Sequence, residues 1–255
     1  MTTLSDSDIR NRMTSGGLIH KGEITQVGPA CYELRMGDVY YDLTESDKPI
    51  DAKQHGSALI KPGHRVVLIT QEELSVPHNL IARITSKGSL FSIGLSPVST
   101  YADPGFSGNI GIVTQNVSDK YITLPIGESI AKVDFSSLSG NVEKPYQGQH
   151  GFKTKIWPIK HQLQKSFEEI REDSRVSSEE AESFKILPRV TANALRSIQQ
   201  KQRKIHWAIL LGMLVNTLVL AAVSTKYWEP IVSVVTNLIS TVIGGIFIWL
   251  SQKKE

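Results

Sequence analysis

Short apolar segments follow one another through the first part of this chain, and glycine and proline interrupt them at short, regular intervals. Segments that read as β-strands are "CYELRMG", "HRVVLIT", "LIARIT", "NIGIVTQN", "YITLP" and "SIAKVDF". The last alternates, with Ala131, Val133 and Phe135 on one face and Lys132 and Asp134 on the other. Many short strands with frequent breaks are typical of an all-β barrel or jelly roll rather than a parallel α/β sheet. We therefore expect a mainly β domain.

We place this domain in residues 1–157. It opens with a short helix, because Ser5 and Asp8 form a capping-box pattern, and we expect that helix to end near Thr14.

Charge and cysteine content exclude several classes of function. The chain has 255 residues, a formal charge of +3, seven histidines and one cysteine, Cys31. So small a charge gives no reason to expect binding to duplex nucleic acid. A single cysteine rules out an internal disulfide and a thiolate zinc cluster, and the histidines are not paired at metal-ligand spacing. We predict no metal site in the protein itself.

The C-terminal part of the sequence contains two uncharged apolar runs, residues 207–224 and 231–250. As helices they would be roughly 27 and 30 Å long, close to the hydrocarbon thickness of a bilayer. Lysine and arginine precede the first run and lysine follows the second. We expect residues 205–255 to form a transmembrane helical hairpin in the inner membrane, with both chain ends cytoplasmic. The alternative is a buried helical hairpin in a soluble domain.

Residues 158–204 are polar and charge-mixed, and we expect a helical linker there. Leu163, Phe167 and Ile170 follow helical spacing and would form one apolar stripe. That stripe could face the linker's own domain or an intersubunit coiled coil.

Several motifs, in the right order, resemble one known superfamily. They are "DSDIRNRM", "GGLI", "GPACYELRMG", "VPHNLIARITSKGSLFSIGL", "DPGFSGNI" and "KPYQGQHGFKTKIW". This order is similar to that of the dCTP deaminase and dUTPase superfamily, closest to the dCTP deaminase branch, over about Leu4 to Trp157. The resemblance implies a distorted β-barrel that forms a homotrimer, with nucleotide sites at subunit interfaces and a C-terminal arm that closes over the ligand. The expected C-terminal helices lie outside the family domain, so an oligomer with a symmetry other than a trimer remains an alternative.

The resemblance also implies a set of ligand-binding residues. In the family an Arg-Ser-Ser turn cradles the triphosphate, with a magnesium ion carried by the phosphates, and the dUTPase acid that orients the attacking water aligns with Asp103. Pro104 and Gly105 suit the central positions of a type II turn after this acid. The candidate ligand-binding residues are Lys87, Gly88, Ser89, Ser92, Asp103, Gln115, Tyr146, Gln149, Phe152 and Lys153.

Departures from the family pattern argue against deamination. The glutamate that serves as general acid and base in dCTP deaminases aligns with Val113, and the serine and arginine that help activate the base align with Gly88 and Ser92. Asp103 leaves two alternatives open: it activates water in a dUTPase-like pyrophosphatase, or it merely caps its turn.

Together these features predict a catalytically inactive, nucleotide-sensing membrane effector. We expect a nucleotide or short oligonucleotide to open or gate a pore formed by a homo-oligomer in the lipid bilayer, as an anti-phage defence in bacteria. The alternatives are a membrane-tethered dUTPase-like nucleotide pyrophosphatase and a scaffold whose barrel only oligomerises.

Overall fold

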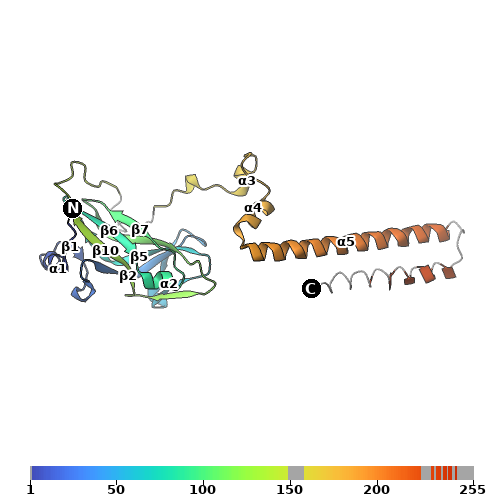
Figure 1. Cartoon of the computed structure of the whole chain (residues 1–255), viewed down its shortest axis with the longest axis horizontal. Helices are drawn as coiled ribbons and strands as arrows, with labels where there is room; N and C mark the ends of the chain where they lie inside the picture. Colours follow the sequence, from blue (N-terminus) through green and yellow to red (C-terminus); the bar gives the residue numbers. More distant parts are fainter. Residues whose placement is uncertain are drawn as a thin grey trace. The chain divides into compact units, whose positions relative to one another are not determined.

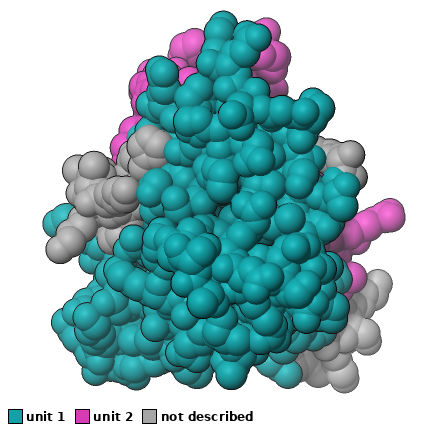
Figure 2. All heavy atoms as spheres, turned by 90° about the vertical axis from the view of Figure 1, so that its left-hand side faces the viewer, with its two compact units in different colours: residues 1–160 teal, residues 161–255 magenta. Residues whose placement is uncertain are grey.

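The computed structural model describes residues 2–148, 158–224, 231–232, 234–236, 238–239, 241–242 and 245. The chain divides into two compact units, residues 1–160 and residues 161–255, drawn in teal and magenta in Figure 2. Each unit is described by itself.

The first unit is mainly β. Its strands are β1 (Leu18–His20), β2 (Tyr32–Asp42), β3 (Pro49–Asp51), β4 (Ser57–Ile60), β5 (Arg65–Ser75), β6 (Leu80–Ser86), β7 (Ser99–Ala102), β8 (Ser107–Gln115), β9 (Ile122–Pro125) and β10 (Ser129–Ser137). An eight-stranded sheet runs in the order β1-β5-β2-β10-β6-β7, with β3 on β2 and β8 on β5, and β4 pairs with β9 (Figure 1). All of these pairings are antiparallel. The mainly β prediction for this region is confirmed.

Alternation along β10 puts one face of the strand in the core. Ala131, Val133 and Phe135 are fully buried, whereas Lys132 and Asp134 are partly exposed. The predicted faces of this strand are therefore confirmed, and every other segment predicted as a strand overlaps a strand of the structure.

Two strands are longer than predicted because each contains a bulge. Between β2 and β5, the partners Met36↔Thr70 and Tyr40↔Leu68 are four residues apart on β2 and two on β5. Between β5 and β8, a similar shift falls between Ile69 and Glu73. Bulges bend a strand and redirect its side chains, and they allow β2 and β5 to run through 11 residues each.

The short helices of the first unit follow local signals. Helix α1 (Asp6–Thr14) has the predicted capping box, in which Asp8 N–H donates to Ser5 Oγ at 3.3 Å and Ser5 N–H donates to Asp8 Oδ2 at 3.1 Å. Helix α2 (Gly88–Ser92) follows β6 directly. Two 3-10 turns, η1 (Ile24–Gln26) and η2 (Ala52–Gln54), complete the unit's described helical elements.

The second unit is helical where it is described. Its elements are the 3-10 turn η3 (His161–Leu163) and the helices α3 (Phe167–Ile170), α4 (Glu179–Ile186) and α5 (Arg189–Ser224). Within residues 158–204 the structure has short helical pieces before the long α5, so the expected stripe of Leu163, Phe167 and Ile170 does not lie on one continuous helix.

The expected transmembrane hairpin requires correction. Among the described residues, no helix is long and apolar enough to cross a membrane. Helix α5 joins the charged end of the linker to the first apolar run in one helix, and Asn216 interrupts that run. Half of the second run, 231–250, lies outside the described residues. The prediction of two membrane-spanning helices is therefore wrong, and so is the multi-pass inner-membrane placement.

Three further expectations depended on those helices. They are the lipid bilayer as a partner, the gated pore and the anti-phage role. With the transmembrane prediction wrong, nothing remains to support them, and they are not carried further.

Candidate functional site

Helix α2 forms the turn that the sequence suggested for phosphate binding. Lys87 is its N-cap in extended conformation, and its carbonyl accepts from the N–H groups of Leu90 and Phe91. Within the described chain, the N–H groups of Gly88 and Ser89 have no acceptor. A Cβ on Gly88 would have no heavy atom within 4 Å, so the turn is open at that point. Exposed N–H groups at such a turn can accept an anion.

Ser92, which the family resemblance aligns with an arginine, lies on the exposed end of the same turn. Its hydroxyl donates to the carbonyl of Ser89 at 2.7 Å. Because this bond stays within the helix, Ser92 supplies neither the charge nor the reach of an arginine.

The Lys87 side chain reaches a carboxylate that sequence reasoning missed. Its Nζ lies 2.8 Å from Glu33 Oε2, and Lys132 Nζ lies 3.7 Å from Glu33 Oε1. The strand register explains this meeting, because Glu33 on β2 lies opposite Lys132 on β10. We call Glu33, Lys87 and Lys132 the Glu33 cluster. The alternation of "SIAKVDF" placed Lys132 on the outer face but gave no sign of its partner.

Electrostatics in the Glu33 cluster favour the charged carboxylate. The hydrogen bond from Lys87 is the largest cause that holds the pKa of Glu33 below its ordinary value, burial acts in the opposite direction, and a bond from Ser129 adds to the lowering. The Glu33 and Lys87 side chains are 28% and 20% exposed, so water and a ligand can reach both.

Asp103 begins a tight turn of the predicted kind. Phe106 N–H donates to the Asp103 carbonyl at 3.0 Å, and Gly105 has φ +91°, as the third position of a type II turn requires. The Asp103 side chain is exposed and, within the described residues, makes no hydrogen bond or ion pair. The backbone therefore closes the turn without the carboxylate.

The beginning of the predicted arm lies against this turn. Tyr146 N–H donates to the Pro104 carbonyl at 2.8 Å, and the Tyr146 and Phe106 rings lie 5.6 Å apart at 60°. A Cβ on Gly105 would come within 3.0 Å of Pro145, so the close contact needs glycine. The remaining arm residues that we selected, Gln149, Phe152 and Lys153, lie outside the described residues.

Strand β8 carries Val113, which the family resemblance aligns with the deaminase glutamate. Val113 is 45% exposed, between the buried Ile112 and Thr114. The side chains that alternate with these buried ones belong to Asn109, Val113 and Gln115, none of which is an acid. The Gln115 side chain already has a partner in its own chain, because its Nε2 donates to the Gly63 carbonyl at 3.1 Å.

One chain does not bring all the candidate residues together. Asp103 follows Ala102, which pairs with Ala82 near the start of β6, whereas Lys87 follows the end of that strand. Five residues of strand span roughly 17 Å. The phosphate turn and Asp103 therefore lie toward opposite ends of the β6–β7 pair.

Comparisons with known proteins agree with this fold. A family model described as dCTP deaminase-like matches residues 3–138, more than half of the 255-residue chain. The chain belongs to the dCTP deaminase-like family. The "dCTP deaminase, dUMP-forming" of Corynebacterium efficiens is 33% identical over 175 residues, covering 58% of this chain and 90% of that protein. The protein of the same name from Methanosphaera stadtmanae is 27% identical over 167 residues, which cover 57% of this chain and 84% of that protein.

Among solved structures, the 2'-deoxycytidine 5'-triphosphate deaminase of Agrobacterium tumefaciens is similar with a TM-score of 0.44 and 18% identity. The match covers 52% of this chain and 48% of that one. The family model confirms the resemblance to the dCTP deaminase-like family for residues 3–138, whereas the fused transmembrane hairpin is not supported.

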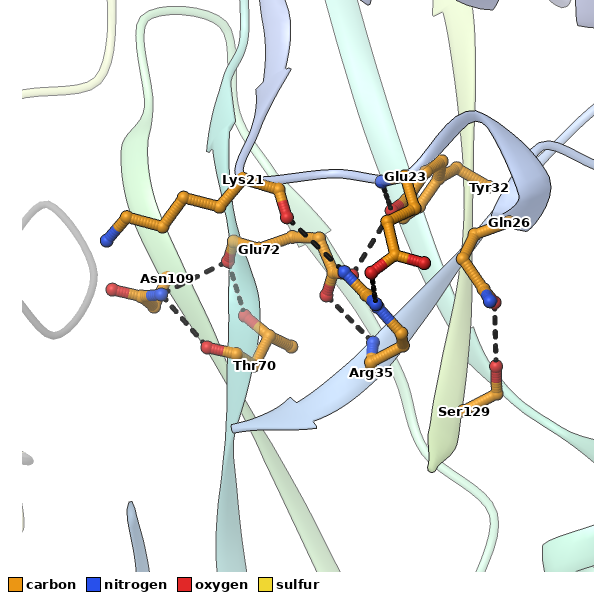
Figure 3. Close-up of polar contacts among 9 residues, drawn as sticks. All are labelled: Lys21, Glu23, Gln26, Tyr32, Arg35, Thr70, Glu72, Asn109 and Ser129. Carbon is orange, nitrogen blue, oxygen red and sulfur yellow. Dashed lines mark hydrogen bonds and ion pairs between the residues drawn. The ribbon is translucent and has the colours of Figure 1, made fainter. Parts of the chain in front are cut away.

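Inside this dCTP deaminase-like domain, a buried ion pair joins β2 to the bulge of β5 (Figure 3). Arg35 Nε lies 2.6 Å from Glu72 Oε1, and Arg35 N–H donates to Glu72 Oε2 at 2.8 Å. The Tyr32 hydroxyl donates to Glu72 Oε1 at 3.1 Å, and burial raises the pKa of Tyr32. Arg35 also pairs with Glu23, which anchors the segment before β2. The Arg35 and Glu72 side chains are 8% and 0% exposed.

An asparagine side chain hydrogen-bonds the backbone carbonyls of β5 where that strand bulges. Asn109 Nδ2 donates to the carbonyls of Thr70 and Glu72 at 2.9 and 3.2 Å (Figure 3). Ile110 N–H donates to Thr70 Oγ1 at 2.9 Å. Side chains thus replace ladder bonds that the register shift removes, and Glu72 is free to face Arg35.

A cleft of about 930 Å³ opens beside this bulge. Its charged lining residues include Lys53 and Asp38, which form a 2.6 Å ion pair, and Lys21 and Glu73, which form another. None of the predicted ligand residues that the structure describes lines this cleft.

Proposed function

We propose that this member of the dCTP deaminase-like family binds a nucleotide at the α2 turn and does not deaminate it. The observation that carries the proposal is Val113 on β8. Deamination needs a group that takes a proton from water and gives one to the leaving amine. A valine can do neither, and the neighbouring outward side chains Asn109 and Gln115 have no suitable acid or base.

Phosphate binding is supported by the α2 turn. The N–H groups of Gly88 and Ser89 point to no acceptor in the described chain, and Lys87 adds a positive charge beside them. A lysine binds phosphate as a point charge, without the two-pronged geometry of arginine. A magnesium ion that the phosphates carry is the cofactor that we expect. The ligand is a mononucleotide or a short oligonucleotide.

The separation of the candidate residues supports a homo-oligomer, provided that one site uses both of them. Lys87 and Asp103 lie roughly 17 Å apart along one chain, which is too far for both to touch one reacting phosphate. A site that uses both must combine the α2 turn of one copy with the Asp103 turn of another. A trimer is the assembly that the family resemblance implies.

A second candidate function is hydrolysis of a nucleoside triphosphate. It is favoured by the Asp103 carboxylate, which is exposed, makes no bond within the described chain and sits on a well-defined turn. A carboxylate in that state could accept a proton from an attacking water, with magnesium neutralising the phosphates.

One experiment separates the two candidates. The full chain is mixed with each deoxynucleoside triphosphate and magnesium, and binding by thermal shift and product by chromatography are read from the same sample. The proposal predicts a ligand-dependent rise in melting temperature without product. Asp103→Asn should leave that shift largely unchanged, and so should the control Asp119→Asn, which alters another exposed aspartate.

Other outcomes decide against the proposal. Conversion of a cytosine to a uracil nucleotide would overturn the claim that deamination is lost. Release of pyrophosphate that Asp103→Asn abolishes and Asp119→Asn retains would make the protein a pyrophosphatase. Absence of any shift with every nucleotide, including short oligonucleotides, would remove the binding claim.

A further inference from the structure

We propose that the end of β2 carries a site for a first-row divalent transition metal, separate from the nucleotide site. The ligands are Asp42, Glu45 and His64. Their candidate ligand atoms all lie within 4.8 Å of one another. They come from three different segments, namely the last residue of β2, the loop that follows it and the turn that precedes β5. We call these three residues the Asp42 cluster.

Local bonds hold the central carboxylate in a defined orientation. Asp42 Oδ1 accepts from the N–H groups of Thr44 and Glu45 at 3.1 and 3.4 Å. Its Oδ2 lies 2.8 Å from His64 Nδ1. Two backbone donors thus fix one oxygen and turn the other toward the imidazole. An orientation set in this way reduces the entropy that a metal ion must overcome on binding.

The charge balance of this region favours a bound cation. The Asp42 side chain is 4% exposed, and within the described residues no lysine or arginine forms an ion pair with it. Buried carboxylates are usually compensated by a cation or by a metal, because loss of hydration is costly. The nearby Lys61 pairs with Glu45 instead. A divalent ion between Asp42 and Glu45 would add positive charge beside Asp42, whose ion-pair partner among the described residues is the imidazole of His64.

The site is also accessible and chemically selective. Asp42 and Glu45 line a cleft of about 660 Å³, which leaves room for water molecules to complete the coordination shell. One imidazole nitrogen with two carboxylates suits Zn²⁺ or Mn²⁺, whereas Mg²⁺ and Ca²⁺ prefer oxygen ligands alone. Because its ligands belong to the protein, this site would not depend on nucleotide.

Lys61 should compete with a metal ion for the Glu45 carboxylate. Its ammonium group forms an ion pair with the Glu45 carboxylate. A metal that takes Glu45 must displace this ammonium group. Removal of the Lys61 charge should therefore strengthen metal binding, whereas removal of a ligand should weaken it.

The test uses the full chain after treatment with a chelator, titrated with ZnCl₂ and separately with MnCl₂ in the absence of nucleotide. Calorimetry should show one saturable site per chain, and the melting temperature should rise with metal. His64→Gln and Glu45→Gln should each weaken binding at least about 10-fold. Lys61→Gln should strengthen it severalfold. His55→Gln removes an exposed histidine that lines the same cleft and should change nothing.

Three results would overturn the proposal. The first is the absence of saturable binding to the wild-type chain. The second is binding that His55→Gln weakens as much as His64→Gln, since surface histidines would then explain it. The third is an affinity that falls, or stays the same, when Lys61 loses its charge. Circular dichroism of each variant without metal checks that the fold is retained, and Lys61→Gln keeps all three ligands.

Discussion

Strand β2 contributes to two clusters of opposite charges that behave differently. Arg35 meets Glu72 in the interior, where both side chains are almost fully buried and every bond is within the protein. Glu33, two residues earlier, meets Lys87 and Lys132 at the surface, where solvent reaches all three. The first cluster can only be satisfied by its own partners. The second can exchange a partner for a ligand.

This difference separates stability from binding along one strand. A buried pair that loses one member leaves an uncompensated charge in the interior, which is severely destabilising. An exposed pair that loses one member gains water in return and changes stability little. Substitutions in the interior should therefore affect folding, and substitutions in the Glu33 cluster should affect ligand affinity.

The largest effect should follow from Arg35→Met. This change leaves Glu72 buried without its cation, and we expect unfolding to become easier by about 3–5 kcal/mol. Urea denaturation followed by circular dichroism measures the loss. The double variant Arg35→Met with Glu72→Leu should recover much of the lost stability, because no isolated charge remains in the interior. A loss below about 1 kcal/mol for Arg35→Met would show that the interior pair is no stronger than a surface pair.

A smaller effect, and on a different property, should follow from Lys87→Ala. We expect affinity for a nucleoside triphosphate to fall about 10-fold, or about 1.4 kcal/mol, while stability changes by less than about 1 kcal/mol. Calorimetric titration and urea denaturation report the two quantities. The matched control is Lys53→Ala, which breaks a different lysine–carboxylate pair, the one with Asp38, and should leave affinity unchanged. If Lys87→Ala and Lys53→Ala bind the nucleoside triphosphate equally well, Lys87 does not contribute to the binding site.

The smallest effect should appear in the pH dependence of stability. The pKa of Glu33 is lowered in the folded chain, so its contribution is fully present above the unfolded value of about 4.3. It is lost as the pH falls through the lower, folded value. Glu33→Gln should therefore reduce stability slightly at pH 7 and converge with the wild type in strong acid. A variant that is less stable than wild type by the same amount at every pH would contradict this assignment.

Much of the β domain could be predicted from sequence because its signals are local. Alternation in "SIAKVDF", the Ser5–Asp8 capping box and the Pro104–Gly105 turn each depend on a few adjacent residues, and the structure contains all three. Short strands such as β1 and β3 escaped prediction, because three residues give too little periodicity.

The contacts between distant residues could not be predicted in this way. Glu33 meets Lys87 across 54 positions of sequence, and Arg35 meets Glu72 only because β5 bulges between Ile69 and Glu73. No pattern of adjacent residues predicts where a strand bulges or in which register two strands pair. The absence of a metal site was likewise inferred from histidine spacing, which cannot detect His64 beside Asp42 in the folded chain.

The transmembrane prediction was made from hydropathy alone. In the structure, the first apolar run is the C-terminal part of a longer helix, α5, that begins at Arg189. Within the described residues no helix meets the requirements of a span.

We propose above all that this dCTP deaminase-like domain binds nucleotide without deaminating it. The most direct test of this proposal is to incubate the full chain with dCTP and magnesium at a concentration where binding is saturated, and to follow the release of ammonia together with the conversion of dCTP. The account predicts bound dCTP that is recovered unchanged over many hours. Stoichiometric or catalytic formation of ammonia and a uracil nucleotide, in proportion to the amount of protein, would show that Val113 does not prevent the reaction and would contradict it.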